Sequence, residues 1–211
     1  MKYIKKEQPP QTFTHWKAQE NEDWKPHWDN FRGKEKFAVH NTLLKEQGYI
    51  CCYCGRRISS KTSHIEHLKP RTNYPNLALE YGNLLASCQG ESEEPPPIPV
   101  HCGHKKKDWY DKQLMVSPLD NNCADFFRFT EAGEILPKND PDKQAAITTI
   151  ERLGLNIDKL KKMRKKAIEA ILDVIEKEEI EALIKGFETP DLEGKYEEFS
   201  GALIYILGGN R

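Results

Sequence analysis

Two cysteines separated by two residues, Cys51 and Cys54, constrain this chain more than any other feature of its sequence. A Cys-x2-Cys pair followed by glycine is typical of a knuckle, in which a tight turn directs two thiolates toward one zinc ion. Structural zinc takes four tetrahedral nitrogen or sulfur ligands, so a second pair is needed. Cys88 and Cys102 are the candidates, and the pattern therefore predicts a Zn²⁺ site built from four cysteines.

The second pair is spaced more widely than usual, because an acidic, proline-rich segment (residues 89–100) separates its members. We expect this segment to loop out at the surface and leave both cysteines in place. His101 is an alternative ligand to Cys102. Cys52 would point to the opposite side of a strand from its neighbour in the knuckle, and Cys123 is isolated, so both are predicted to be thiols outside the metal site.

Between the two cysteine pairs lies a group of residues suited to the hydrolysis of phosphodiester bonds. His67 can act as general base, because imidazole titrates near neutral pH. Glu66 can supply a carboxylate to a catalytic Mg²⁺ or Mn²⁺ ion, although on a regular strand it would point away from His67. Asn83 is predicted to hold a loop carbonyl or to orient the His67 ring. We expect His64 to contact the substrate or to support the metal site.

A basic run follows the last of the paired cysteines. His104 and Asp108 are each candidates to complete the catalytic metal site. Three consecutive lysines are predicted to contact substrate phosphates: Lys105, Lys106 and Lys107. A second lysine-rich run covers residues 159–166. Because 32 Lys and Arg residues nearly cancel 33 Asp and Glu residues, any affinity for nucleic acid must come from such local clusters.

The composition predicts a soluble protein with a modest core, since 37% of the 211 residues are hydrophobic and 31% are charged. No stretch approaches the roughly 18 apolar residues of a membrane-spanning helix. The N-terminal residues lack the apolar region of a signal peptide, so we expect a cytoplasmic protein. In that reducing compartment the six cysteines are better interpreted as metal ligands and buried thiols than as disulfides.

The hydrophobic pattern and the turn residues predict several further elements. Aromatic residues in positions 1–33 are expected to anchor an extended arm to the core. In chain order, the predicted elements are a helix from Gly33 to Gln47, a strand from Tyr49 to Tyr53, a short helix from Gly103 to Leu114, a hairpin from Phe126 to Leu136, a helix from Asp140 to Gly154, a longer helix capped by Asn156, and an amphipathic stretch from Tyr196 to Leu207.

The central motifs resemble the HNH endonuclease motif. The resemblance is carried by Cys51/Cys54, Glu66-His67, Asn83-Leu84-Leu85, Cys88 and Cys102. It implies that His67 is the general base, Glu66 the neighbouring metal ligand and Asn83 the middle asparagine. His104 is expected at the third position, with Lys106 as the alternative. The chain departs from the commonest pattern in having glutamate in place of aspartate and in its long insert between the second pair of cysteines.

A wider resemblance covers most of the chain. It is carried by the opening residues 1–6, by Glu46-Gln47-Gly48-Tyr49-Ile50-Cys51, by His64-Ile65-Glu66-His67-Leu68-Lys69-Pro70-Arg71 and by Ser117-Pro118-Leu119. In these motifs the chain is similar to the retron-associated HNH endonuclease family, which includes the PtuB subunit of Septu-type anti-phage systems. The resemblance implies a defence nuclease that acts with a PtuA-like ATPase, sometimes together with a retron reverse transcriptase and its RNA/DNA product.

The expected fold class is therefore α+β, with a zinc-clamped ββα-metal (HNH) core embedded in a mainly helical protein. We divide it into an N-terminal arm and helix (residues 1–48), a nuclease module (49–116), and a hairpin with C-terminal helices (117–211), packed as one compact unit. The predicted function is metal-dependent cleavage of DNA or RNA. One alternative is a non-catalytic zinc-ribbon adaptor that binds nucleic acid or the ATPase, and a weaker one is a thiol redox protein.

Overall fold

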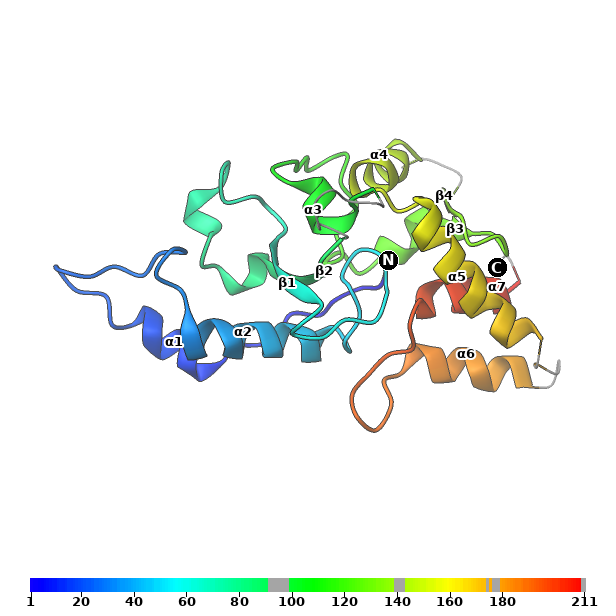
Figure 1. Ribbon diagram of the computed structural model, residues 1–211, viewed down its shortest axis with the longest axis horizontal. Helices are drawn as coiled ribbons and strands as arrows, with labels where there is room; N and C mark the ends of the chain where they lie inside the picture. Colours follow the sequence, from blue (N-terminus) through cyan, green and yellow to red (C-terminus); the bar gives the residue numbers. More distant parts are fainter. Residues whose placement is uncertain (91–98, 139–142, 174, 176–178, 210–211) are drawn as a thin grey trace.

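The computed structural model describes residues 1–90, 99–138, 143–173, 175 and 179–209. Figure 1 shows an elongated molecule, with the first two helices at one end, a small sheet in the middle and the C-terminal helices at the other end. Most of the proline-rich segment 89–100 and the predicted helix start at Asp140 lie outside the described residues. Within the described ranges, no helix is both long and apolar enough to cross a membrane.

The described residues combine helices with two small two-stranded antiparallel sheets, so the molecule is of the mixed α+β class, as predicted. The helices are α1 (Gln11–Lys17), α2 (Gly33–Glu46), α3 (Cys102–Lys106), α4 (Lys143–Leu153), α5 (Asp158–Leu172), α6 (Ile180–Glu188) and α7 (Ser200–Leu207). The strands are β1 (Ser63–His67), β2 (Leu84–Cys88), β3 (Phe127–Phe129) and β4 (Ile135–Pro137). Short 3₁₀ turns are η1 (Pro75–Leu77), η2 (Tyr81–Asn83) and η3 (Cys123–Phe126).

The N-terminal arm is held by aromatic packing, as the sequence predicts. Phe31 is fully buried, and its ring centroid lies 5.2 Å from that of Trp16 and 5.5 Å from that of Trp28. The arm also contains the short helix α1, which the sequence did not predict. The predicted helix α2 is present and buries Leu43, whereas the apolar Phe37 on the same helix is 61% exposed.

The sheet at the centre of the molecule consists of β1 and β2, which pair antiparallel with His67 opposite Leu84. All five residues of β2 are buried. The side-chain amide of Gln47 donates to the carbonyl of Ala86 at 2.8 Å and accepts from its backbone N–H at 2.7 Å. Because this amide satisfies both backbone groups of Ala86, it replaces a third strand and ties α2 to the sheet.

The predicted strand from Tyr49 to Tyr53 is wrong. This segment is a turn with a single bridge between Ile50 and Arg57. The knuckle geometry explains the difference, because the backbone N–H of Gly55 donates to the carbonyl of Cys51 at 3.1 Å and so closes the turn. A closed turn leaves these backbone groups unavailable to a strand partner.

The C-terminal part begins with the predicted hairpin, formed by β3 and β4. The turn between them lies against α5, whose buried Arg164 donates to the carbonyl of Gly133 at 2.7 Å. Asn156 does not cap α5; its side chain instead bonds both backbone groups of Ile135, at 2.9 and 2.7 Å. The short helix predicted from Gly103 to Leu114 ends at Lys106, well before Leu114.

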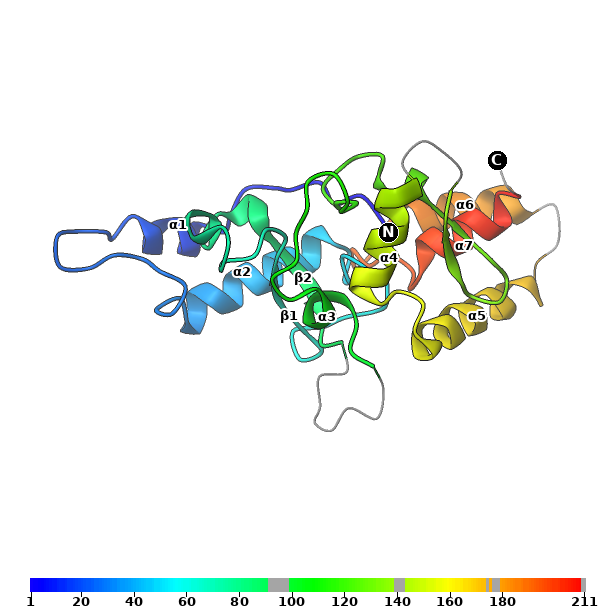
Figure 2. The same ribbon diagram turned by 90° about the horizontal axis from the view of Figure 1, so that it is seen from above.

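The chain returns to the knuckle near its C-terminal end. The backbone N–H of Phe199 donates to the carbonyl of Gly55 at 2.8 Å, and Arg57 donates to the carbonyls of Gly48 and Tyr196. In the view of Figure 2, α4 lies next to α3, against which it packs, while α5, α6 and α7 gather at the far end. The C-terminal segment therefore covers the back of the cysteine turn.

Candidate metal centre and catalytic cleft

The four paired cysteines come together as the sequence predicts. The sulfur atoms of Cys51, Cys54, Cys88 and Cys102 all lie within 4.8 Å of one another. Four sulfurs around a zinc ion at about 2.3 Å stand about 3.8 Å apart, and the Cys54 and Cys88 sulfurs are separated by 3.9 Å. The donor set and its spacing fit zinc, so these residues form a group that can hold a metal ion.

The thiols of the sulfur group differ in how readily they ionise. Burial raises the pKa of Cys102, and the hydrogen bond of Cys88 with Cys102, which lowers the pKa of Cys88, is outweighed by its hydrogen bonds with Cys51 and Cys54. Cys51 is the thiol whose surroundings favour the thiolate. Burial opposes ionisation of Cys51, but hydrogen bonds from Cys102 and other neighbouring thiols outweigh it and lower the pKa of Cys51 well below its ordinary value. The backbone N–H of Cys88 also points at the Cys51 sulfur, 3.3 Å away. A sulfur that already accepts hydrogen bonds carries negative charge more readily and therefore binds a cation more readily.

The other thiols and the alternative ligand lie outside this group. Burial raises the pKa of both Cys52 and Cys123, so each is a neutral buried thiol. His101 is buried beside the group, with its Nδ1 atom 3.1 Å from the Cys102 sulfur and 3.7 Å from the Cys88 sulfur. His101 is therefore placed to hydrogen-bond with these two sulfurs, while Cys102 is the fourth member of the sulfur group.

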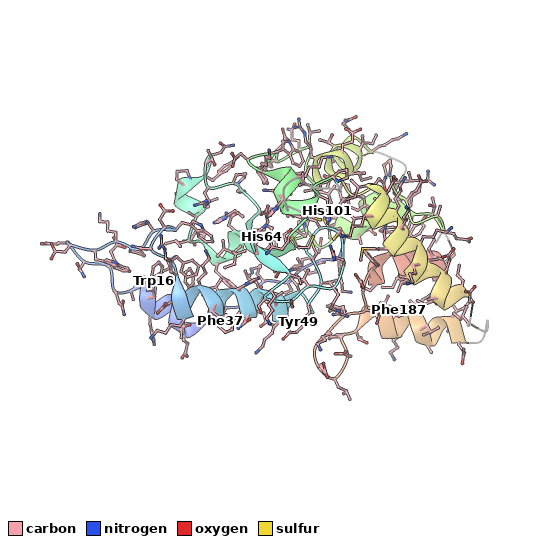
Figure 3. All side chains as sticks on the ribbon, in the orientation of Figure 1. Trp16, Phe37, Tyr49, His64, His101 and Phe187 are labelled. Carbon is pink, nitrogen blue, oxygen red and sulfur yellow. The ribbon has the colours of Figure 1, made fainter. Side chains whose placement is uncertain are left out.

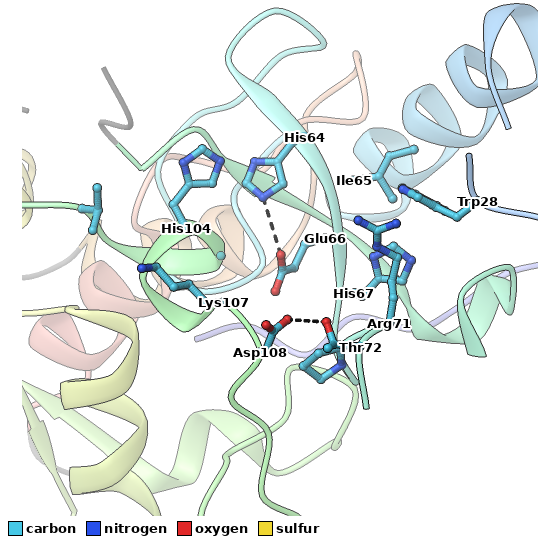
Figure 4. Close-up of a pocket in the computed structure, with 13 residues that line it drawn as sticks. Trp28, His64, Ile65, Glu66, His67, Arg71, Thr72, His104, Lys107 and Asp108 are labelled. Carbon is cyan, nitrogen blue, oxygen red and sulfur yellow. Dashed lines mark hydrogen bonds and ion pairs between the residues drawn. The ribbon is translucent and has the colours of Figure 1, made fainter. Parts of the chain in front are cut away.

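Strand β1 presents His64 and Glu66 on one face, because alternate residues of a strand share a side. The Nε2 atom of His64 lies 3.5 Å from Oε2 of Glu66 (Figure 4). The other carboxylate oxygen, Oε1, accepts from Tyr53 at 3.2 Å and pairs with Lys106 at 2.8 Å. Only Oε2 is therefore directed toward the imidazole and the space beyond it.

Glu66 is ionised despite its position. Burial opposes ionisation, but the hydrogen bond from His64 and the charge of Lys106 outweigh it and lower the pKa of Glu66. A charged carboxylate and a neighbouring imidazole could supply some of the ligands of a divalent cation. His104 on α3 faces the same space, with its ring centroid 4.6 Å from that of His64.

Gly103 leaves room for the Glu66 carboxylate and the His64 imidazole, and the sequence alone gave no sign of this role. A Cβ atom at this position would lie 2.6 Å from Oε2 of Glu66 and 2.8 Å from Nε2 of His64, closer than such atoms approach. The absence of a side chain lets α3 come directly against β1. The backbone N–H of Gly103 also donates to Ser87 at 3.2 Å, which fixes the helix to β2.

His67 lies at the end of β1 with its ring held in one orientation. Its Nε2 atom is 3.0 Å from the carbonyl oxygen of Ala78. Because a carbonyl only accepts, Nε2 carries the proton and Nδ1 is left as the acceptor. The side chain is buried, and burial lowers the pKa of His67. At neutral pH the imidazole is therefore neutral and can take a proton from water.

Asn83 holds the loop that carries this carbonyl, one of the two roles that the sequence predicts for it. Its side-chain oxygen accepts from the backbone N–H of Lys69 at 2.8 Å. Its amide donates to the carbonyl of Lys69 at 2.9 Å and to that of Leu77 at 3.2 Å. Leu77 directly precedes Ala78, so the position of the His67 ring depends on Asn83.

The residues of the basic run are placed differently from one another. Lys105 and Lys107 are exposed and therefore accessible to a phosphate. Lys106 is buried, with its ammonium on Glu66 and 2.9 Å from the carbonyl of His67, so it does not face a substrate as expected. Asp108 accepts from Thr72 at 2.8 Å across the opening and does not join the histidines (Figure 4).

His64, Glu66, His67 and His104 border one cleft of about 610 Å³. Its lining residues are Trp28, His64, Ile65, Glu66, His67, Pro70, Arg71, Thr72, Val100, Gly103, His104, Lys107 and Asp108. Both faces of β1 border this space, His64 and Glu66 from one face and Ile65 and His67 from the other. Trp28 and Arg71 are members that the sequence did not assign to the site.

Comparison with known proteins agrees with this arrangement. No protein-family profile matches the chain. The chain is 34% identical over 152 residues to the "Retron Vc95 putative HNH endonuclease" of Vibrio cholerae, covering 69% of this chain and 70% of that protein. It is 29% identical over 91 residues to the Septu protein PtuB of Bacillus thuringiensis, covering 42% of this chain and 35% of that protein.

A four-cysteine group that could hold a metal ion lies beside a cleft lined by histidines and a carboxylate. The similarity to the Vibrio cholerae protein extends over two thirds of both chains. The chain belongs to the family of retron-associated HNH endonucleases, which the sequence motifs had predicted.

Proposed function

We propose that this protein is a metal-dependent endonuclease that hydrolyses phosphodiester bonds in nucleic acid. The observation that carries the proposal is the fixed orientation of His67, whose Nε2 atom is occupied by the Ala78 carbonyl at 3.0 Å while the ring borders the cleft. His67 takes the proton of the attacking water at Nδ1. In this proposal β1, β2 and α3 form the ββα-metal core of the nuclease module, residues 49–116.

Two metals have separate places in the proposal. Zn²⁺ is held by the four cysteines and has a structural role, because all four corners are protein ligands. Mg²⁺ or Mn²⁺ is held by Oε2 of Glu66 with His64 and His104 beside it. When bound, this divalent ion stabilises negative charge that develops on the phosphate oxygens. Lys106 and Tyr53 keep the carboxylate ionised and fixed.

The names of the relatives suggest a biological setting. We propose that the protein is the nuclease of an anti-phage defence system in the cytoplasm and that it acts with a PtuA-like ATPase. A retron reverse transcriptase and its RNA/DNA product are proposed as further partners. The support is the similarity to a retron-associated protein and to a Septu protein. Exposed Lys105 and Lys107 are proposed to bind substrate phosphates.

A cleavage assay tests this proposal. The purified protein is incubated with Mg²⁺ or Mn²⁺ and with plasmid DNA, single-stranded DNA or total RNA. His67→Ala is expected to lose cleavage at least 100-fold while keeping its zinc. His15→Ala, which changes an exposed histidine on α1, is the matched control and is expected to cleave normally. Equal cleavage by His67→Ala and the wild type would contradict the assignment.

The same assay separates the nuclease from a non-catalytic zinc adaptor. An adaptor needs the cysteine group, but it needs neither the bond between His67 and Ala78 nor the support of their loop by Asn83. If the wild-type protein binds nucleic acid or the ATPase but cleaves no substrate with either metal, the adaptor explains the chain better.

A further inference from the structure

Trp28 belongs to the N-terminal arm, outside the proposed nuclease module, yet it lines the cleft. Its ring centroid lies 4.3 Å from that of His67, and the two ring planes meet at 70° (Figure 4). This is an edge-to-face aromatic contact. Together with the hydrogen bond to Ala78, it restricts both the position and the tilt of the imidazole.

The rest of the arm holds Trp28 in place. Its ring packs on Phe31, which is fully buried, at a centroid distance of 5.5 Å. Phe31 in turn packs on Trp16, and Trp16 packs on Trp24 at 5.5 Å. In Figure 3 the labelled Trp16 lies at the end of the molecule where this arm packs on α2. The contact with His67 is therefore backed by a fixed cluster.

Two cations lie over the Trp28 ring. The guanidinium carbon of Arg71 is 5.4 Å from the ring centroid, and the ammonium of Lys36 is 5.0 Å from it. Arg71 lines the cleft, whereas Lys36 is absent from its lining. Asp29 lies 4.0 Å from the guanidinium, but both side chains are largely exposed, so this ion pair is weak.

We propose that the N-terminal arm is part of the active site, in which Trp28 positions His67 and presents Arg71 to a substrate phosphate beside the scissile one. A planar guanidinium held over an aromatic ring keeps its N–H groups available for bidentate contact with a phosphate. Lys107 lies on the other side of Glu66 in Figure 4, so the cleft has a cation at each end. A strand that passes between them brings one phosphate to His67.

This inference rests on the proposed nuclease function, and the first test compares two tryptophans of one cluster. Trp28→Ala is expected to lower kcat roughly 10- to 100-fold with little change in KM, because a displaced base loses its alignment with the water. Trp28→Phe, which keeps an aromatic edge, is expected to recover most of kcat. Trp24→Ala is the milder change in the same cluster, because the Trp24 ring packs on Trp16 whereas Trp28 packs on Phe31 and His67, and it is expected to lower kcat less than about threefold. Zinc content and melting temperature show that each variant is folded.

The second test compares two cations on one ring. Arg71→Ala and Lys36→Ala each remove a charge that contacts Trp28, but only Arg71 reaches the cleft. Binding to a short DNA duplex and to total transfer RNA is measured with each change placed in a His67→Ala background, over a series of salt concentrations. Arg71→Ala is expected to weaken binding roughly tenfold. It is also expected to lower the slope of log affinity against log salt concentration by about 1, the value for the loss of one phosphate contact. Lys36→Ala is expected to leave both values nearly unchanged.

The outcomes separate this inference from the proposed function. If the wild-type protein cleaves and Trp28→Ala retains the wild-type kcat, the positioning role is wrong while the nuclease assignment stands. If Arg71→Ala and Lys36→Ala weaken binding equally, the phosphate contact of Arg71 is wrong. If the wild-type protein cleaves nothing, the proposed function fails, and the binding series still decides whether Arg71 contacts phosphate.

Discussion

The ammonium nitrogen of Lys106 lies 2.8 Å from Oε1 of Glu66, and both side chains are buried. The same ammonium donates to the carbonyl of His67 at 2.9 Å. One residue of α3 therefore fixes two neighbouring residues of β1, the proposed metal ligand and the proposed base. Its role is to position the site rather than to bind substrate.

Replacing Lys106 by methionine is expected to destabilise the protein by about 3 kcal/mol, because it leaves the Glu66 carboxylate buried without its main charge partner. The same change at Lys105, which is exposed on the same helix, is expected to cost less than about 0.5 kcal/mol. Urea denaturation of both variants measures the difference. Equal stabilities would show that the ion pair does not form in solution.

Asn83 offers a test that distinguishes its donor and acceptor roles. Asn83→Ala removes three hydrogen bonds and is expected to cost about 3 kcal/mol. Asn83→Asp keeps the acceptor for Lys69 but places a carboxylate against two carbonyls, so it is expected to be no more stable than the alanine variant. Both changes should also reduce cleavage at least tenfold, because the Ala78 carbonyl moves. An aspartate variant with wild-type stability and activity would contradict the loop-holding role.

The cysteine group was predictable because metal ligands are recognised by residue type and spacing, which are properties of the sequence. The presence of α2 followed similarly from its apolar period, although Phe37 is exposed, and the hairpin around Gly133 followed from its turn residues. The strand expected at Tyr49 was wrong because the closed turn of the knuckle overrides the strand preference of its aromatic and β-branched residues. Local preference is a weak guide where a metal site dictates the backbone.

The parts of the cleft that the sequence did not reveal depend on contacts between distant segments. Trp28 and His67 are 39 positions apart in the sequence, and nothing in either neighbourhood indicates their contact. Lys106 stands between two exposed lysines in an apparently uniform basic run, yet it alone turns inward. Periodicity on a five-residue helix is too short to separate its buried face from its solvated one.

Zinc removal should affect folding as well as metal content. We expect one zinc ion per chain, and Cys88→Ser is expected to lose it and to lower the melting temperature by at least about 10 °C. Cys52→Ser and Cys123→Ser are the matched controls, since both thiols are buried outside the sulfur group, and they are expected to retain zinc. Metal analysis and thermal denaturation check this prediction. Retained zinc in Cys88→Ser would exclude the four-sulfur site.

Acid should destabilise the folded protein through His40 on α2. Burial, together with the nearby charges of His64 and Lys36, lowers the pKa of His40 in the folded state. The unfolded chain therefore binds a proton at a higher pH than the folded chain does, and stability present above about pH 6.5 is lost as the pH falls through the folded pKa. His67 acts in the same direction, because burial also lowers its pKa.

Unfolding free energies from urea denaturation are expected to decline between pH 7.5 and pH 5.5 in the wild type, and less steeply in His40→Gln. His15→Gln, with its exposed side chain, should follow the wild-type slope. A slope that His40→Gln leaves unchanged would assign the acid sensitivity to other groups.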